Sequence, residues 1–301
     1  MALFEKTDTI MKISYKLSLF LIFTFGISWS LAIGYSIAGG NMSPISTGFF
    51  IMALGFMLTP MISVILVEKL FLKSRLRSVY PLNIRWNRWW WIAWLSPLAI
   101  ALITFVAGLC VPGVEFSPEM EGMFYRFSNI LTPEQLAQMR NTSMPVHPFF
   151  LSIIQGLIAG ITINTLAGFG EELGWRGLML KELSHLGFWK TSWITGLVWG
   201  IWHAPVIMMG HNYPDHPMAG VAMMTIFCIL ISPLFTLVAL RSGSTIAAAV
   251  LHGSFNALSG IAVLLLSGGN DLLIGVTGTA GISVLVVLNL VILKFLRTGK
   301  S

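Results

Sequence analysis

The sequence predicts an all-α integral membrane protein with eight transmembrane helices and both termini in the cytoplasm. Of the 301 residues, 55% are hydrophobic and only 10% are charged, whereas a soluble domain carries about 25% charged residues. Eight stretches are apolar over roughly the 20 residues needed to cross a bilayer. The basic residues gather in short segments beside these stretches, a pattern that orients membrane proteins and argues against a nucleic-acid partner.

The predicted spans cover about 16–38, 46–67, 89–111, 148–169, 191–209, 218–240, 244–266 and 272–295. The first run follows Lys12 and Lys16, as in a signal peptide, but it is longer than a typical signal-peptide core and is interpreted as a retained span. The fourth is expected to continue as a helix through two glutamates to about Glu182.

Orientation follows from the positive charges. With the N-terminus inside, 16 of the 18 Lys and Arg residues lie in the cytoplasm, and only Arg126 and Arg140 lie outside. The outside loop 112–147 is the largest segment between spans, and a short helix is predicted from Pro133 with Thr132 as its N-cap. Residues 1–301 are therefore interpreted as a single membrane domain, surrounded by the lipid bilayer, with its polar core at about 150–260.

Two further residue types are interpreted as structural. Five tryptophans open the third span and predict an interfacial aromatic belt: Trp86, Trp89, Trp90, Trp91 and Trp94. Cys110 and Cys228 lie in separate apolar stretches, which indicates two small core residues rather than a disulfide or a thiolate metal site.

A group of charges ends the fourth span, in the order Glu171-Glu172-Leu173-Gly174-Trp175-Arg176. On a helix, Glu172 and Arg176 are four residues apart and can form an ion pair. Glu171 points about 100° away from Glu172 and can face a cavity instead. Taken alone, the motif fits an ordinary salt bridge at a helix end better than a functional site.

Two histidines lie within later spans. His203 shares a helix face with Trp199 and precedes Pro205, which ends or kinks a helix and frees carbonyl groups. His252 shares a face with Asn256, four residues further along. Each pair alone could be a polar contact between helices. Ionisable groups at membrane depth are costly, however, and are kept mainly where a buried site uses them.

Considered together, these residues predict one cavity, open to the cytoplasm, that holds a carboxylate, two imidazoles and an amide. Such groups can activate water and stabilise an oxyanion, as amide hydrolysis requires. Glutamate and histidine are also zinc ligands. The loop segment from His211 through Asp215 to His216 could bind a metal too, but lies on the opposite side from the glutamates and is interpreted as a polar turn.

The ordered set Glu-Glu-x-x-x-Arg from Glu171, Trp-x-x-x-His ending at His203, and His-x-x-x-Asn from His252 resembles the CAAX protease and bacteriocin-processing family (CPBP, or Abi), which includes the Rce1-type prenyl-protein endopeptidases. The resemblance covers about residues 150–260. Trp199 departs from it, because a phenylalanine is frequent at that position, although an aromatic ring is retained.

The resemblance implies an eight-helix intramembrane endopeptidase that acts on a membrane-associated peptide or protein, for which a prenylated CAAX-type substrate is one candidate. It implies that Glu171 and His203 activate water and that His252 and Asn256 stabilise the oxyanion. Glu172, Arg176 and Trp199 would support them.

Zinc has been proposed for this family, and Glu171, His203 and His252 would then be its ligands. A metal-free reaction is favoured here, because Asn256 suits an oxyanion donor better than a zinc ligand. Two other functions stay open at this point: a non-catalytic immunity or scaffold protein, and an ion-coupled transporter. A transporter would be expected to repeat its motifs in both halves, and residues 1–150 contain no motif similar to the Glu and His motifs.

Overall fold

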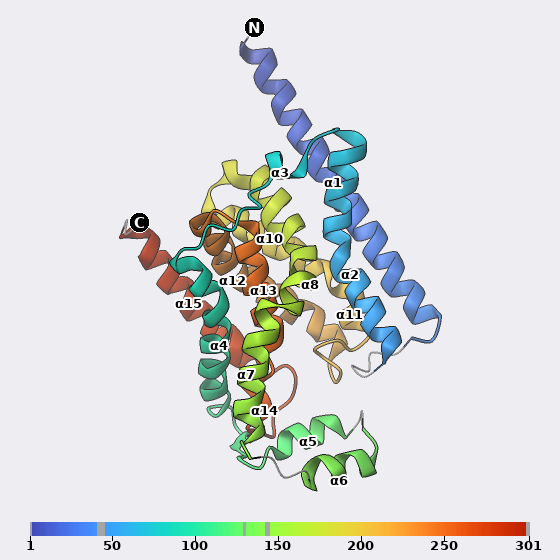
Figure 1. Ribbon diagram of the computed structural model, residues 1–301, viewed down its shortest axis with the longest axis vertical. Coiled ribbons are helices and arrows are strands. Elements are labelled where there is room, and N and C mark those ends of the chain that lie inside the picture. The colour runs from blue at the N-terminus through green and yellow to red at the C-terminus, as the bar shows by residue number, and fades with distance from the viewer. Residues whose placement is uncertain (1, 41–45, 129–130, 142–144, 299–301) are drawn as a thin grey trace.

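The protein is a helix bundle, shown as a computed structural model that describes residues 2–40, 46–128, 131–141 and 145–298 (Figure 1). Its first half contains α1 (Ala2–Ile37), α2 (Thr47–Leu66), the π-helix η1 (Val67–Phe71), α3 (Leu76–Val79), α4 (Arg88–Gly108), β1 (Glu115–Phe116), α5 (Glu121–Phe127) and α6 (Pro133–Asn141). Its second half contains α7 (Pro148–Ile161), α8 (Ile163–Glu172), the π-helix η2 (Leu173–Met179), α9 (Leu180–Leu183), η3 (Ser184–Leu186), α10 (Phe188–Trp202), α11 (Ala204–Met208), α12 (Pro217–Ser242), α13 (Thr245–Leu258), α14 (Ile261–Leu264), β2 (Leu266–Ser267) and α15 (Thr279–Arg297). The predicted all-α class is confirmed.

Within the described residues, six helices are long and apolar enough to cross a membrane, or seven spans if the bent pair α7–α8 counts as one. The six are Tyr15–Ile37, Thr47–Phe71, Arg88–Gly108, Pro217–Ser242, Thr245–Leu264 and Thr279–Arg297. They correspond to the first three and the last three predicted spans. Eight spans and cytoplasmic termini stay predictions.

The two middle spans differ from the expected continuous helices. The fourth is broken at Thr162, where α7 and α8 meet at an angle of 50°. Beyond this break the chain stays helical through η2 to the end of α9, as expected. The fifth is interrupted at His203, because Pro205 has no N–H to continue the hydrogen bonding of α10. Neither piece of this span is long enough to cross a bilayer alone.

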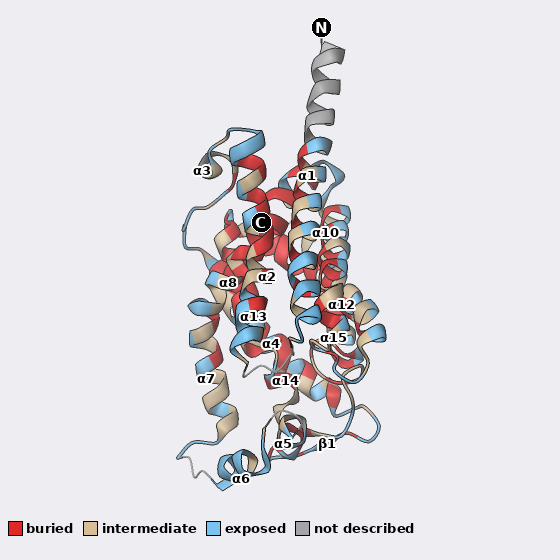
Figure 2. Cartoon of the chain, turned by 90° about the vertical axis from the view of Figure 1, so that its right-hand side faces the viewer, coloured by how far each residue is buried: buried red, intermediate tan, exposed pale blue. Residues whose placement is uncertain are grey.

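Helices α12 and α13 form the buried centre of the bundle (Figure 2). Glycines bring α10 against α12, since a Cβ added to Gly196 or Gly200 would lie 2.5 Å from Cys228 O or Thr225 Cα, respectively. Large apolar side chains remain exposed on the outer helices, among them Ile22 and Leu166. Such a surface fits a bilayer as the surrounding solvent.

The two ends of the bundle differ. The start of α1 and the end of α15 lie toward one end, and α5, α6 and the short sheet lie at the other (Figures 1 and 2). In that sheet Glu115 pairs with Ser267 and Phe116 with Leu266, in antiparallel order. The predicted helix from Pro133 is α6, and its first turn is capped by mutual hydrogen bonds between Thr132 and Gln135.

Two smaller expectations are corrected. Only part of the tryptophan run is at the surface: Trp86 and Trp91 are exposed, whereas Trp89 and Trp90 are buried in the core. The burial follows from packing, because the Trp90 indole donates to Arg85 O and the Trp89 ring contacts Phe295 edge to face. Cys228 is a buried core residue as expected, but Cys110 is exposed, and both are free thiols.

Candidate active site

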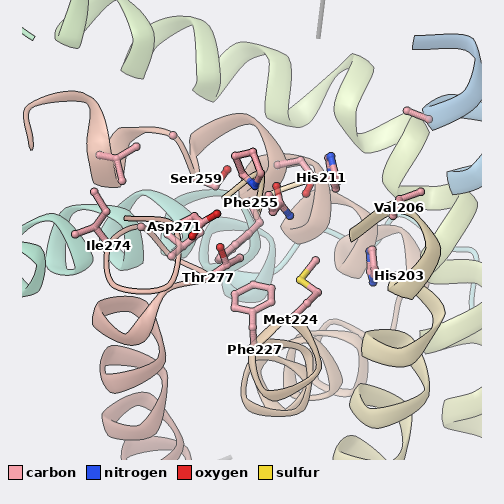
Figure 3. Close-up of a pocket in the computed structure, with 18 of the residues that line it drawn as sticks. His203, Val206, His211, Met224, Phe227, Phe255, Ser259, Asp271, Ile274 and Thr277 are labelled. Carbon is pink, nitrogen blue, oxygen red and sulfur yellow. The ribbon is translucent and has the colours of Figure 1, made fainter. Parts of the chain in front are cut away.

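A cavity of about 1390 Å³ lies within the bundle. Five of the seven side chains singled out in the sequence line it: Glu171, Trp199, His203, His252 and Asn256. Most of the remaining wall is apolar. Figure 3 shows Met224 and Phe227 of α12 around the cavity, with Phe255 of α13 and His203. A cavity with apolar walls and a few convergent polar groups is the usual form of a ligand site.

Glu171 lies in the last turn of α8 and is nearly inaccessible to solvent. Its Oε2 accepts a hydrogen bond of 2.7 Å from the indole N–H of Trp199 and a longer one of 3.4 Å from Trp175. Its Oε1 lies 3.7 Å from His252 Nε2. One carboxylate oxygen is therefore held by indoles, while the other remains available beside the His252 ring.

Glu172 lies behind Glu171, is not among the residues that line the cavity, and contacts both a guanidinium and an imidazole. Its Oε1 is 3.1 Å from the guanidinium of Arg176 and 2.8 Å from His252 Nδ1. Arg176 also donates to Ser232 Oγ at 2.9 Å and lies over the rings of Trp199 and Phe235. As the sequence predicts, one carboxylate of the pair is used in an ion pair while the other faces the cavity.

His252 is thus placed between two carboxylates. Its Nδ1 contacts Glu172, so Nδ1 carries the donated proton, and its Nε2 is directed toward Glu171. Two carboxylates and one guanidinium leave a net negative charge in a buried cluster. A protonated His252 would neutralise that charge, and both of its ring nitrogens would then be donors.

His203 is oriented by the chain break that follows it. Its Nδ1 lies 2.8 Å from the carbonyl oxygen of Trp199, and because a carbonyl only accepts, Nδ1 carries the proton. The lone pair of the neutral ring is then on Nε2. Trp199 therefore connects two candidate residues: its indole N–H binds Glu171 and its carbonyl fixes the tautomer of His203.

The structure adds residues that the sequence reasoning missed. Asn164 also lines the cavity, Trp175 donates to Glu171, and Ser232 accepts from Arg176. Trp175 and Asn164 could have been found, because they lie four residues after and seven residues before Glu171, which places them on the same helix face. Ser232 carried no sequence signal, because only the packing of α12 brings it to Arg176.

The direction of the cavity requires a correction. It extends from Glu171 to Glu121 and Tyr125 of α5 and to the loops at 211–215 and 267–277. These segments lie at the end of the bundle away from both termini (Figure 1). The cavity mouth and the termini therefore cannot both face the cytoplasm, although the sequence led us to expect both. The reason is that the cavity begins at Glu171 and extends toward the far end, and not toward the end that holds the termini.

The loop from His211 to His216 is also closer to the site than expected, since His211 and Asp215 line the same cavity. It remains a polar turn, as predicted. The backbone N–H of Asp215 and the ring of His216 both contact the Asp271 carboxylate, at 2.8 and 2.6 Å, which ties this turn to the loop before α15.

The described residues do not fit a metal centre. No three His, Cys, Asp or Glu side chains within the described ranges come together closely enough to hold a metal ion. Of the trio considered in the sequence, Glu171 Oε1 and His252 Nε2 are 3.7 Å apart, and His203 Nδ1 contacts the Trp199 carbonyl. We therefore derive no chemical step through a metal.

Residues 148–258 match the Rce1-like family, the type II CAAX prenyl endopeptidases. A stretch of 49 residues is 41% identical to the CAAX prenyl protease 2 of Methanococcus maripaludis, covering 16% of this chain and 18% of that protein. This part of the chain is therefore similar to the Rce1-type CPBP proteins. The resemblance expected from the three motifs is confirmed, and the match to the methanococcal protein spans less than a fifth of that protein's length.

The Rce1-like segment runs from the start of α7 to the end of α13 and contains all seven predicted site residues. With its long apolar helices, the chain is a multi-pass membrane protein, as predicted.

Proposed function

We propose that the protein is an intramembrane endopeptidase that hydrolyses a peptide bond of a membrane-associated peptide or protein. The observation that carries the proposal is the double contact of Trp199, which binds Glu171 through its indole and His203 through its carbonyl beside one cavity. Two proton acceptors held in fixed positions at a cavity wall suit the activation of a water molecule.

In the proposed reaction, Glu171 Oε1 and His203 Nε2 hold the attacking water. One of them takes its proton as the water oxygen bonds to the scissile carbonyl carbon. The Asn256 amide and the Nε2–H of protonated His252 donate to the oxyanion that forms, and preorganised donors of this kind commonly supply the largest part of catalysis. The intermediate then collapses, the C–N bond breaks, and the proton passes to the leaving amine.

Glu172 and Arg176 act through His252 in this scheme. Glu172 accepts the Nδ1–H of His252 at 2.8 Å and so directs its Nε2 toward the cavity. Arg176 balances the Glu172 charge at 3.1 Å and is itself held by Ser232. These contacts fix ring orientation in the way that outer carboxylates orient histidines in other catalytic sites.

The proposed substrate class follows from the size and walls of the cavity. Its volume of about 1390 Å³ exceeds the roughly 300–1,000 Å³ of common small-molecule pockets. Aromatic and methionine side chains line much of it. A peptide that carries an apolar modification, such as a prenylated CAAX-type C-terminus, fits this combination better than a polar peptide.

The test is cleavage of internally quenched peptides by purified protein reconstituted into lipid vesicles. We expect wild type to cleave a farnesylated peptide in preference to its unmodified counterpart, and Glu171→Ala and His203→Ala to be inactive although folded. Cleavage that survives both substitutions would contradict the assigned site. Failure of folded wild type to cleave any peptide, together with an ion flux that needs these residues, would favour a transporter.

The metal question is tested in the same preparation. Elemental analysis of active protein and titration with a chelator measure whether activity depends on bound zinc. We expect cleavage to persist in protein from which no stoichiometric metal is detected. Loss of activity with the chelator and its recovery with added zinc would contradict the metal-free reaction.

A further inference from the structure

Asn164 is an unexplained polar side chain in the cavity. It lines the same cavity as Glu171 and Asn256. Among the described residues it has no hydrogen-bond partner, whereas Asn289 in α15 donates to both Leu230 O and Leu285 O. The Asn164 side chain is half-buried at the cavity wall. A ligand that displaces water from this wall would leave the amide unsatisfied unless the ligand itself supplies a hydrogen-bond partner.

The position of Asn164 is fixed by the break between α7 and α8. Thr162 has φ −112° and ψ −102°, outside the helical region, and the two helices meet at 50°. The hydroxyl of Thr165 donates to the carbonyl of Gly160 at 2.6 Å, which satisfies one of the groups freed by the break. Asn164, the second residue of α8, is therefore held at a stable bend rather than in a mobile loop.

The break is packed directly against α13, the helix that carries His252 and Asn256. A Cβ added to Gly253 would lie 2.4 Å from Thr165 N and 2.6 Å from Asn164 C, so only glycine allows this approach. The backbone of Asn164 is thus in contact with a residue between His252 and Asn256. Nearby on α8, Ile163 and Leu166 are 64% and 73% exposed. These two side chains mark the lipid-facing side of α8, which differs from the side that faces the cavity.

The helix geometry relates Asn164 to the reacting bond. Asn164 precedes Glu171 by seven residues, or about 10.5 Å along α8 at about 1.5 Å per residue. An extended peptide rises about 3.3 Å per residue, so this distance corresponds to about three substrate residues. Because α8 runs away from the break toward Glu171, Asn164 lies on the mouth side of the catalytic residues.

We propose that Asn164 is a substrate-positioning residue that binds the main chain of the peptide about three residues from the scissile bond, on the side of the cavity mouth. This rests on the proposed function. The N–H and C=O of one residue in an extended strand point to the same side. A carboxamide offers an acceptor and donors that match them. Asn164 would therefore bind any residue at this position, provided that the substrate is extended there.

The experiment combines Asn164→Ala with substrate esters. A series of quenched lipidated peptides carries an ester in place of one amide, at each of the residues two to four from the scissile bond on either side. We expect one ester to lower kcat/KM of wild type by about threefold to tenfold, the range of a single hydrogen bond. On the amide peptide, Asn164→Ala should lower kcat/KM by a similar factor, mainly by raising KM. For this variant, the same ester should lower kcat/KM no further.

Asn289→Ala is the matched control, because it removes a hydrogen-bonded asparagine that does not line the cavity. We expect it to lower the unfolding temperature while keeping the wild-type ester pattern. Asn164→Asp keeps an acceptor for the peptide N–H and loses the donors for the peptide carbonyl, so it should keep the ester penalty at this position while lowering kcat/KM on the amide peptide.

Two failures can be told apart. If wild type cleaves the peptides but Asn164→Ala shows the same ester pattern as wild type, the role of Asn164 is wrong and the proposed function stands. If folded wild type cleaves none of the peptides, both proposals are wrong.

Discussion

Two clusters of buried charges lie in different parts of this bundle, and their surroundings differ. The cavity cluster consists of Glu171, Glu172, Arg176 and His252, and two of its members face the cavity. The end cluster consists of Lys16, Glu68, Tyr80 and Glu182, and none of its members lines that cavity. Both are buried and both are rich in ion pairs.

In the end cluster the polar groups bind one another. Lys16 Nζ lies 2.5 Å from Glu68 and 3.4 Å from Glu182, and Glu68 also accepts from Tyr80 and Ser74. Burial, together with the Glu68 carboxylate, raises the pKa of the Tyr80 phenol, which therefore remains a donor. In the cavity cluster, Glu171 Oε1 and the His252 ring remain beside open space. The two clusters therefore differ in their access to a cavity, and not in burial or in pairing of charge, which supports the placement of the proposed site at the cavity cluster.

The largest expected difference between the clusters is in activity. Glu171→Gln removes the proposed acceptor while keeping the size of the side chain, so kcat should fall by roughly 10²–10⁴-fold. Glu68→Gln removes a carboxylate that is equally buried but remote from the cavity, and the kcat of its folded fraction should stay near that of wild type. Initial rates on the quenched lipidated peptide, corrected for folded protein, measure both. Equal losses of kcat in the two variants would contradict the placement of the active site at the cavity cluster.

The next difference concerns stability. Arg176→Met leaves Glu172 with only His252 as a charged partner, and removal of one member of a buried pair costs about 3–5 kcal/mol. Lys16→Met leaves two carboxylates, Glu68 and Glu182, without their cation and should cost a comparable amount. Thermal unfolding in detergent micelles compares the two.

The double variant Arg176→Met with Glu172→Gln sharpens this result, because it removes the charge that the single change leaves behind. It should recover part of the lost stability. No recovery would mean that packing of the Arg176 guanidinium over Trp199 and Phe235, rather than its charge, is the main contribution.

A third prediction concerns pH at the cavity mouth, where neither cluster lies. Burial lowers the pKa of His211 from 6.5 to about 4. Between these values the unfolded chain binds a proton that the folded protein does not, so stability should fall as pH decreases from about 6.5 toward 4. His211→Gln should show a weaker decrease in its unfolding temperature over this window. An identical decrease would assign the effect to other groups.

The smallest effect is expected from an exposed ion pair at the same end. Arg140 of α6 contacts Glu121 of α5 at 2.7 Å, with side-chain exposures of 47% and 51%. Pairs in water contribute about 0–1 kcal/mol, so Arg140→Ala should change the free energy of unfolding by no more than that. Denaturant titration measures it, with Lys181→Ala as an exposed control at the other end. A loss comparable to that of Arg176→Met would contradict the distinction between buried and exposed pairs.

The cavity cluster could be foreseen from the sequence because its residues interrupt apolar stretches at helical spacing. Glu171, His203, His252 and Asn256 were each visible in this way, and the structure brings all four to one cavity. The end cluster was not foreseen. Lys16 and Glu68 flank predicted spans, where a charge is ordinary, and their contact depends on how α1 packs against η1.

Two features of the fold also escaped prediction for physical reasons. The break at Thr162 has no proline, and it is accommodated by the close approach of Gly253 on a helix ninety residues later. The position of the mouth depends on the loops at 211–215 and 267–277, which hydropathy treats only as connections between spans. Local patterns specify helices and faces, but not which loops fold over a cavity.

The separation of the cavity mouth from the start of α1 and the end of α15 has a practical consequence for reconstitution. An affinity tag on either terminus would be displayed on the membrane side opposite the end toward which the cavity extends. Vesicles captured by an accessible tag would therefore carry their cavity mouths toward the lumen. Water-soluble reporter peptides added outside would miss that population, whereas vesicles that escape capture would be the ones able to process them.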